Sequence, residues 1–292
     1  AVLISIGAST DKKLGIEGEQ AEGVISAVSF LRDVGEDKSP DLTGQEVAVI
    51  GGGNVSMDAV RTAKRLGAKK VSIVYRRRTA DMTALPAEIE GAVAEGIEVL
   101  TLKAPSRIET DEKGHVSGIY VTPQMISKIK DGRASVCPTG EEDFLIPCQT
   151  LIVAIGQDIV SEPFERAGIP AKRGRFLAQK DSSIAEKDGV FAGGDCVTGP
   201  ATVIRAIAAG KVAAANIDNY LGFNHKIESG VVVPEPRIEN KTPCGRVTMM
   251  ERNTTERKKD FNIVENGMTC KEANQEAHRC LRCDRFGYGV FK

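Results

Sequence analysis

The sequence predicts an α/β protein with a parallel sheet, followed by a loop-rich tail. Thirty glycines and many short runs of valine, isoleucine and alanine suit tight turns between buried strands and helices. An apolar strand over residues 46–50, a helix over 57–66 and a second strand over 71–75 form a βαβ unit of about 30 residues. Beyond Gly222 the periodic apolar runs end and prolines become frequent, which indicates an extended tail over residues 223–292.

Hydrophobic patterning places the other elements around this unit. Residues 1–6 are typical of a buried central strand, and no turn or helix precedes them, so we expect a fragment or a natural split subunit. Residues 23–34 have helical spacing, and residues 35–43 have the composition of a linker. The remaining expected elements are a helix over 86–95, strands over 97–102 and 106–121, a charged and irregular hairpin excursion over 124–143, a buried strand over 150–155, a strand and turn over 189–195, an alanine-rich helix over 202–220 and a short helix over 271–281.

The charge balance and the cysteines exclude several classes of protein. Lysine and arginine together number 39 and aspartate and glutamate 40, which gives a net charge of −1. Proteins that bind nucleic acids or anionic membranes usually carry a basic excess, so neither is an expected partner. No apolar run reaches the roughly 18 residues of a membrane span. Seven cysteines, an odd number, with no recognisable secretory signal, indicate reduced thiols and a cytoplasmic protein.

Residues 51–56, Gly-Gly-Gly-Asn-Val-Ser, have the G-x-G-x-x-G spacing of a dinucleotide-binding turn, with serine in the third glycine position. Gly51 permits the tight turn out of the strand, and Gly53 has no Cβ, so a pyrophosphate can approach the helix N-terminus. Ser56 is small enough for the helix to pack closely on the strand. The alternative is an ordinary βα turn without a ligand, but the preceding strand and the following helix favour the nucleotide.

The end of the second strand indicates which nucleotide binds. An NAD site usually has an aspartate or glutamate there, whereas this chain has Tyr75 followed by Arg76, Arg77 and Arg78. Guanidinium groups bind a 2′-phosphate through charge-assisted hydrogen bonds, so the sequence favours NADPH over NADH. Arg77 and Arg78 are the leading candidates for phosphate ligands. Arg76 is a further candidate contact to the cofactor, with a structural ion pair as its alternative role. The alternative is a solvated basic patch, because three adjacent arginines cannot all point the same way.

A second turn predicts half of a flavin site. Gly193, Gly194 and Asp195 end a strand, and a helix is expected from Thr202. This arrangement places a carboxylate beside a helix N-terminus. The carboxylate can accept hydrogen bonds from ribityl hydroxyls, and the helix dipole can stabilise negative charge on a reduced flavin. The alternative is a capped βα turn without a ligand.

Four segments together resemble the glutamate synthase small-subunit family, namely residues 51–58, 74–78, 154–157 and 189–195. That family includes the flavoprotein half of dihydropyrimidine dehydrogenase and the large subunit of NADH-dependent ferredoxin:NADP oxidoreductase. The resemblance covers roughly residues 1–222. It implies the two-dinucleotide-binding-domain flavoprotein fold, in which a Rossmann-like NADPH domain is inserted into an FAD domain.

The resemblance also implies domain boundaries and cofactor contacts. The domains are a partial FAD domain over 1–40, an NAD(P)H domain over 41–155, the C-terminal part of the FAD domain over 156–222 and a tail over 223–292. The implied NADPH contacts are Gly51, Gly53, Asn54, Val55, Ser56, Arg77 and Arg78; the implied FAD contacts are Gly7, Gly194, Asp195, Thr202 and Val203; and Gly156 and Gln157 lie at the crossover where nicotinamide meets flavin.

One departure from the family bears on FAD binding. The family has a first glycine-rich βαβ motif before the segment that matches residues 4–7, whereas the fingerprint beginning at Gly51 is the only one in this chain. We therefore expect FAD to be shared with a missing segment or a partner chain.

The implied function is an NADPH-linked oxidoreductase module that passes hydride and electrons between NADP(H), FAD and iron–sulfur centres in a larger redox complex, with electron bifurcation as one form. Because the cofactors carry the chemistry, no catalytic side chain is named. Two alternatives stay open. A pyridine-nucleotide disulfide reductase would need a C-x-x-C pair inside the NADPH domain, where only Cys137 and Cys148 occur. A non-catalytic nucleotide-binding subunit would keep the fold without flavin.

The tail carries a cysteine cluster, Cys244, Cys270, Cys280 and Cys283. The helix and C-x-x-C of residues 272–283 resemble the opening of the family's iron–sulfur segment. A C-x-x-C spacing aims two thiolates at one metal or cluster. An iron–sulfur cluster, a structural zinc site that includes His278, and a dithiol or free thiols are the competing interpretations.

Overall fold

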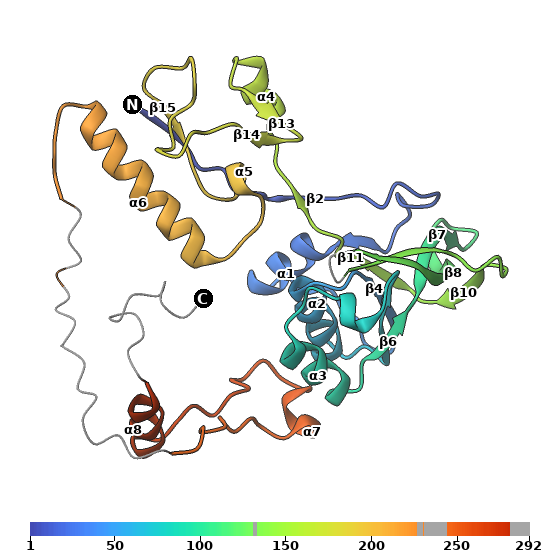
Figure 1. Cartoon of the computed structure of the whole chain (residues 1–292). Coiled ribbons are helices and arrows are strands. Elements are labelled where there is room, and N and C mark those ends of the chain that lie inside the picture. The colour runs from blue at the N-terminus through green and yellow to red at the C-terminus, as the bar shows by residue number, and fades with distance from the viewer. Residues whose placement is uncertain (131–132, 227–229, 231–243, 281–292) are drawn as a thin grey trace. The chain divides into compact units, whose positions relative to one another are not determined.

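The computed structural model describes residues 1–130, 133–226, 230 and 244–280 (Figure 1). Its contacts divide the chain into two compact units, Ala1–Ile227 and Glu228–Lys292. Within the described ranges, no helix combines the length and apolar character needed to cross a bilayer.

A five-stranded parallel sheet forms the centre of the first unit. Its strands, in spatial order, are β3 (Val24–Ser26), β11 (Thr150–Val153), β4 (Glu46–Ile50), β5 (Lys70–Tyr75) and β6 (Glu98–Thr101). Strand β11 pairs with both β3 and β4, so the end of the predicted 150–155 strand lies beside the end of the 46–50 strand. Because these strands are parallel, the turns that follow them gather at one edge of the sheet.

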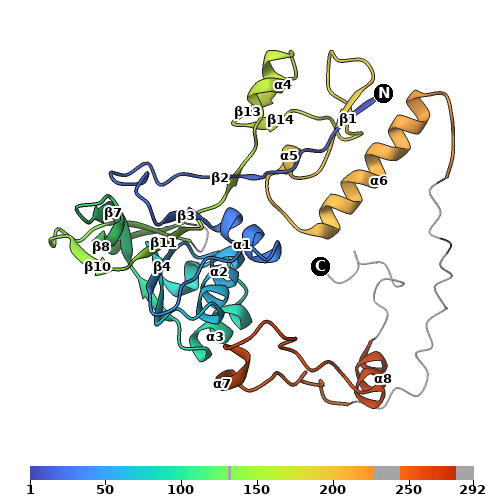
Figure 2. The same cartoon turned by 180° about the vertical axis from the view of Figure 1, so that it is seen from behind.

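Three helices cover one face of this sheet (Figure 2). They are α1 (Ala27–Gly35), α2 (Asn54–Arg65) and α3 (Pro86–Ala94). Val49 of β4 and Met57 of α2 belong to the core between the sheet and these helices. The prediction of a helix over 23–34 is wrong for its first residues, because residues 24–26 pair with β11 and the helix begins only at Ala27.

An antiparallel sheet covers the other face. Its strands are β7 (Lys103–Thr110), β8 (Val116–Lys130), β9 (Arg133–Pro138) and β10 (Phe144–Pro147). Ala48 of β4 packs in one core with Ile119 and Val121 of β8. The hairpin excursion expected over residues 124–143 is confirmed, because β8 and β9 pair as a long hairpin, although its strands are regular where an irregular segment was expected. Backbone hydrogen bonds form this ladder whatever the polarity of the side chains, so a charged segment can pair as regularly as an apolar one.

A smaller α/β part completes the first unit. β1 (Val2–Ile4) pairs in parallel with β15 (Val190–Ala192). Its other elements are α4 (Glu162–Arg166), β13 (Ala171–Lys172), β14 (Arg175–Phe176), α5 (Asp195–Thr198) and α6 (Val203–Tyr220). Two short strands, β2 (Thr10–Asp11) and β12 (Gln157–Asp158), pair antiparallel where the chain passes between this part and the five-stranded sheet (Figure 1).

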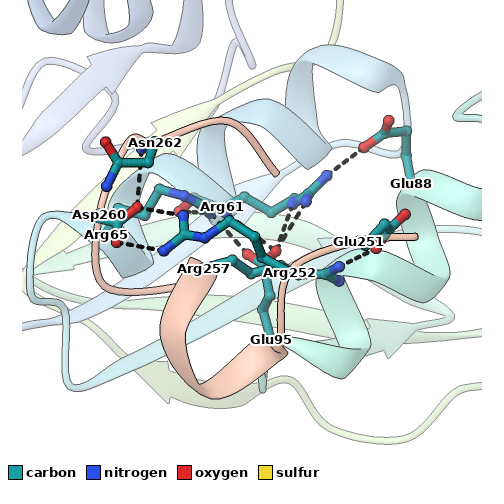
Figure 3. Close-up of polar contacts among 9 residues, drawn as sticks. All are labelled: Arg61, Arg65, Glu88, Glu95, Glu251, Arg252, Arg257, Asp260 and Asn262. Atoms are coloured by element: carbon teal, nitrogen blue, oxygen red, sulfur yellow. Dashed lines mark hydrogen bonds and ion pairs between the residues drawn. The ribbon is translucent and has the colours of Figure 1, made fainter. Parts of the chain in front are cut away.

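Among its described residues, the second unit contains two short helices, α7 (Thr254–Arg257) and α8 (Cys270–Arg279), and the latter confirms the helix expected near 271–281. Thr269 and Glu272 form a capping box at the start of α8. Ahead of α8, Arg252 binds Asp260 through two hydrogen bonds of 2.7 and 2.8 Å, and Arg257 pairs with Glu251 (Figure 3).

Candidate dinucleotide-binding site

The glycine turn after β4 is locked beneath the ends of two neighbouring strands. The Gly51 N–H donates to the carbonyl oxygen of Val74 over 3.1 Å. Gly51 has a φ of +148°, and a Cβ there would lie 2.3 Å from the Ala154 carbonyl oxygen. Only glycine fits this position, as the motif predicts.

Gly53 leaves the start of α2 accessible. It is the N-cap of the helix and has extended backbone angles. A Cβ on Gly53 would meet only the hydroxyl of Thr83, at 3.4 Å. The N-terminal N–H groups of a helix attract anions, so this open approach suits a phosphate. Ser56, the third position of the motif, is buried beneath the turn, where it fills the small space between helix and strand.

A segment that the sequence did not single out, residues 79–85, borders the glycine turn. The Gly52 carbonyl oxygen accepts hydrogen bonds from the N–H groups of Thr83 (2.9 Å) and Ala84 (3.1 Å). The Asn54 side chain accepts from the Leu85 N–H over 2.9 Å. Asn54 therefore orients this segment. No local pattern predicts the contact, because the bonded residues lie 31 positions apart.

These elements enclose a cleft of about 500 Å³ at the edge of the parallel sheet. Of the predicted site residues, those that line it are Gly51, Gly53, Asn54, Val55, Arg76, Arg77, Gly156 and Gln157. Lining residues that the sequence analysis missed include Asp11, Tyr75, Thr83 and Pro105. Their contribution depends on how β2, β7 and the 79–85 segment fold back to this edge.

The three arginines separate into two roles. Arg76 and Arg77 line the cleft, whereas the described lining residues do not include Arg78. Arg78 instead binds Asp81 through two hydrogen bonds, Nε to Oδ2 at 2.8 Å and Nη2 to Oδ1 at 2.9 Å. The ion pair that was the alternative role for Arg76 is therefore formed by Arg78, whereas Arg76, also a candidate cofactor contact, lines the cleft. The i,i+3 spacing of Arg78 and Asp81 across a short 3₁₀ turn (Thr79–Asp81) brings the two groups together.

Arg77 combines a fixed backbone with an unsatisfied side chain. Its carbonyl oxygen accepts from the Leu102 N–H over 3.1 Å. Its Nε is buried, and the part of the chain that the structure describes provides no hydrogen-bond partner for it. A buried donor without a partner costs free energy, so an anion that reached Arg77 would relieve this cost.

The paired strands β2 and β12, called the crossover strands here, form another wall of the cleft. Gly156 has a φ of +120°, and its carbonyl oxygen accepts from the Lys12 N–H over 3.2 Å. Gln157 pairs with Asp11 in the β2–β12 ladder. Gly156 and Gln157 thus lie in the same cleft as the glycine turn.

A second, smaller pocket of about 200 Å³ lies against β1 and β15. Three predicted residues meet there, Gly7, Gly194 and Asp195, and Gly194 has a φ of +80°. The predicted contacts Thr202 and Val203 are not among the described residues that line it. The wall is instead formed further along α6 by small residues, Ala206, Ala209, Gly210 and Ala213.

The tail cysteines do not meet at one point in the part of the chain that is described. Cys270 begins α8 and Cys280 caps its end, so ten residues separate them, or about 15 Å along the axis. One ion with Zn–S bonds of about 2.3 Å cannot bind both thiolates. Cys244 lies against the middle of α8, with its Sγ 3.6 Å from the Gln275 carbonyl oxygen. Cys283 lies outside the described residues. Within those residues, no three His, Cys, Asp or Glu side chains group as metal ligands.

The parallel sheet with its glycine turn, the two crossover strands and the second α/β part define a flavoprotein fold with two dinucleotide-binding domains. The FprA protein of Mycobacterium tuberculosis in complex with NADPH shares this fold, with a TM-score of 0.60 and 22% identity over 76% of this chain and 63% of FprA. The chain belongs to the pyridine nucleotide-disulphide oxidoreductase family, whose profile matches residues 1–210.

Two curated relatives confirm the resemblance found in the sequence. The beta subunit of NADP(+)-dependent formate dehydrogenase from Moorella thermoacetica is 36% identical over 99% of this chain and 43% of its own length. The small chain of NADPH glutamate synthase from Escherichia coli is 32% identical over 76% of this chain and 50% of its own length. The chain thus spans about half the length of these relatives.

Proposed function

We propose that this chain is the NADP(H)-binding part of an FAD-dependent oxidoreductase that exchanges hydride between NADP(H) and flavin as a subunit of a larger redox complex. The observation that carries this proposal is one cleft that contains an open helix N-terminus, two arginines and the crossover strands. Each feature suits a different part of NADPH. Two relatives whose names include NADP(+) or NADPH support the choice of nucleotide.

In this proposal, Gly53 and Val55 at the start of α2 hold the pyrophosphate, because a phosphate there meets free N–H groups and the positive end of the helix dipole. Arg76 and Arg77 bind the 2′-phosphate, as their guanidinium groups form charge-assisted hydrogen bonds with phosphate oxygens. Gly156 and Gln157, on the wall of the crossover strands, border the nicotinamide. The described cleft contains no carboxylate immediately after β5 that would favour NADH.

The smaller pocket fits part of a flavin nucleotide. Gly7 and Gly194 leave room for a close approach, since no atom lies within 4 Å of a Cβ built on either residue. Asp195 supplies a carboxylate that accepts hydrogen bonds from hydroxyl groups. When bound, FAD supplies a ring that accepts or returns the hydride of NADP(H). The chain's own residues position the two nucleotides and exclude water from the space between them.

The flavin site needs further polypeptide in this proposal. The start of α6 presents apolar side chains to solvent, with Val203 76% and Ile204 79% exposed. Val2 on β1 is 59% exposed. Apolar surface of this kind marks an interface. We therefore propose that FAD is shared with a segment or subunit that covers β1 and α6, which agrees with the greater length of the relatives.

The finer parts of the proposal concern the wider complex. We propose that other redox subunits accept the electrons of the flavin and that the complex lies in the cytoplasm. Electron bifurcation is one way in which such a complex divides its electrons between acceptors. Iron–sulfur centres belong to the same proposal, with Cys280 and Cys283 as a ligand pair and Cys244 as the third candidate; zinc is the alternative. Because the described cysteines do not assemble a centre, no step of the reaction is derived through one.

Nucleotide titration tests the proposal. Wild-type protein should bind NADP⁺ at least about tenfold more tightly than NAD⁺, the effect of one charge-assisted contact worth about 1.4 kcal/mol. The Arg76→Gln/Arg77→Gln variant should lose this preference, whereas Arg166→Gln, on the exposed helix α4, should keep it. Equal affinities of the wild-type protein for the two nucleotides would refute the proposed NADP(H) site.

A further inference from the structure

The carboxylate of Asp81 is buried and engaged in four hydrogen bonds. Besides the two bonds from the Arg78 guanidinium, it accepts from the Arg78 N–H over 3.3 Å and from the Ala134 N–H of β9 over 3.0 Å. The Asp81 side chain is 1% exposed and that of Arg78 is 32% exposed. A carboxylate that accepts from so many donors has few conformations open to it, so the Asp81 carboxylate holds the Arg78 guanidinium in one orientation.

Asp81 is also tied to the wall of the nucleotide cleft. The hydroxyl of Tyr75, a cleft-lining residue, donates to the Asp81 carbonyl oxygen over 2.8 Å. Two residues later, Thr83 lines the cleft and its N–H donates to Gly52. The segment from Asp81 to Thr83 is therefore fastened to β5, to β9 and to the glycine turn.

The ion pair of Arg78 with Asp81 removes one of the three arginine charges that follow β5 from the charge available to a ligand. The hydrogen bonds from Arg78 are the main reason why the pKa of Asp81 is held well below its usual value, so the pair consists of two opposite charges that cancel at neutral pH. The guanidinium of Arg78 is turned onto Asp81, while Arg76 and Arg77 line the cleft. The charge available to a ligand in the cleft therefore comes from the latter two.

We propose that Asp81 is a positioning residue for nucleotide selectivity. Its carboxylate binds the Arg78 guanidinium and cancels the charge of that group, so that Arg76 and Arg77 alone recognise the 2′-phosphate. This proposal rests on the proposed function. It makes Arg78 necessary for selectivity although Arg78 does not bind the phosphate. The reason is electrostatic, because Arg78 masks a buried carboxylate that would otherwise repel the ligand.

The proposal predicts opposite effects for the two single variants. Arg78→Gln uncovers the negative charge of Asp81, so the affinity for a 2′-phosphate should fall. Asp81→Asn leaves the positive charge of Arg78, so the affinity should not fall and should depend more steeply on salt. The double variant Arg78→Gln/Asp81→Asn is again neutral, so it should bind like the wild-type protein.

Calorimetric titration of the full chain with 2′-phospho-ADP-ribose, and with ADP-ribose as the matched ligand, tests this reasoning. For 2′-phospho-ADP-ribose we expect Arg78→Gln to weaken binding by about three- to tenfold, as estimated for one uncancelled charge nearby in salt solution. The double variant should recover to within about twofold of the wild-type affinity, and ADP-ribose binding should be unchanged throughout. Recovery of this kind is not expected if the pair only supports the fold.

Two results would overturn the inference. If the double variant binds 2′-phospho-ADP-ribose as weakly as Arg78→Gln, Arg78 is a direct ligand or the pair is purely structural. If Arg78→Gln leaves the affinity unchanged, Asp81 does not influence the site. A wild-type chain that binds the two ligands equally well would instead refute the proposed NADP(H) site, so the two failures are distinguishable.

Discussion

The carboxylate of Glu95 lies 2.8 Å from Arg65, Oε2 to Nη1, and its side chain is fully buried at the end of α3. Arg61 of α2 binds the other oxygen of Glu95, with Nη2 2.9 Å from Oε1, and also reaches Glu88, as Figure 3 shows. Two cations from α2 thus hold one anion of α3. Since α2 begins at the glycine turn, this network fixes the helix whose N-terminus forms the candidate pyrophosphate site.

Glu95→Gln should therefore destabilise the first unit strongly. The amide removes the buried anion that Arg61 and Arg65 share, and breaking a buried ion pair in this way costs about 3–5 kcal/mol. The midpoint of urea unfolding measures the change. Glu98→Gln is the matched control, because Glu98 forms an exposed pair with Lys70 at 3.1 Å and should change stability by less than about 1 kcal/mol. Similar midpoints for both variants would show that the Glu95 network does not stabilise the fold.

The same network predicts a pH dependence of stability. Burial acts to raise the pKa of Glu95, but the hydrogen bonds and charges of Arg65 and Arg61 outweigh it, so its pKa is lowered on folding. A carboxyl with a lowered pKa in the folded state contributes stability above its unfolded pKa of about 4.3 and loses that contribution as the pH falls further. When the urea midpoint of unfolding is measured from pH 7 down to pH 3.5, it should thus decrease once the pH is below about 4.3. The midpoint of the Glu95→Gln variant should decrease less steeply in that range, and an identical slope for the two proteins would contradict the assignment.

The sequence predicted what depends on local chemistry and missed what depends on long-range packing. The turn at Gly51 and Gly53 follows from backbone geometry that neighbouring residues encode, so its position was correct. The assignment of the ion pair among three consecutive arginines was not, because it depends on Asp81 and on the distant β9 strand. Glu95 gave no signal either, since its partners lie 30 and 34 positions earlier on another helix.

Gly51→Ala should destabilise the five-stranded sheet. The new Cβ would lie 2.3 Å from the Ala154 carbonyl oxygen, which is backbone and cannot move aside without disturbing β11. The left-handed φ adds strain, and together these effects should cost more than about 2 kcal/mol. Thermal unfolding checks this, and a variant as stable as the wild-type protein would show that the turn is not packed as described.

Gly53→Ala should separate ligand binding from stability. A Cβ on Gly53 meets only the Thr83 hydroxyl at 3.4 Å, so the fold should tolerate it. That Cβ would stand where a phosphate approaches the helix, so the affinity for NADP⁺ should fall by about tenfold or more. Titration and thermal unfolding of the same sample provide both readings. Unchanged affinity would place the pyrophosphate elsewhere.

The cysteines of the first unit should differ sharply in reactivity. Burial raises the pKa of the Cys148 thiol to about 12. Cys148 lies between β10 and β11 and is only 1% exposed. At pH 8 only about one Cys148 in ten thousand is then a thiolate, and the thiolate is the reactive form. Iodoacetamide should therefore modify the half-buried Cys137 on β9 well before Cys148, as read by mass spectrometry of the digested protein. Unfolding in urea should make the two equally reactive, which controls for the reagent. Rapid labelling of Cys148 in the native protein would mean that the core between the two sheets opens far more often than its packing implies, because labelling then proceeds through the open state.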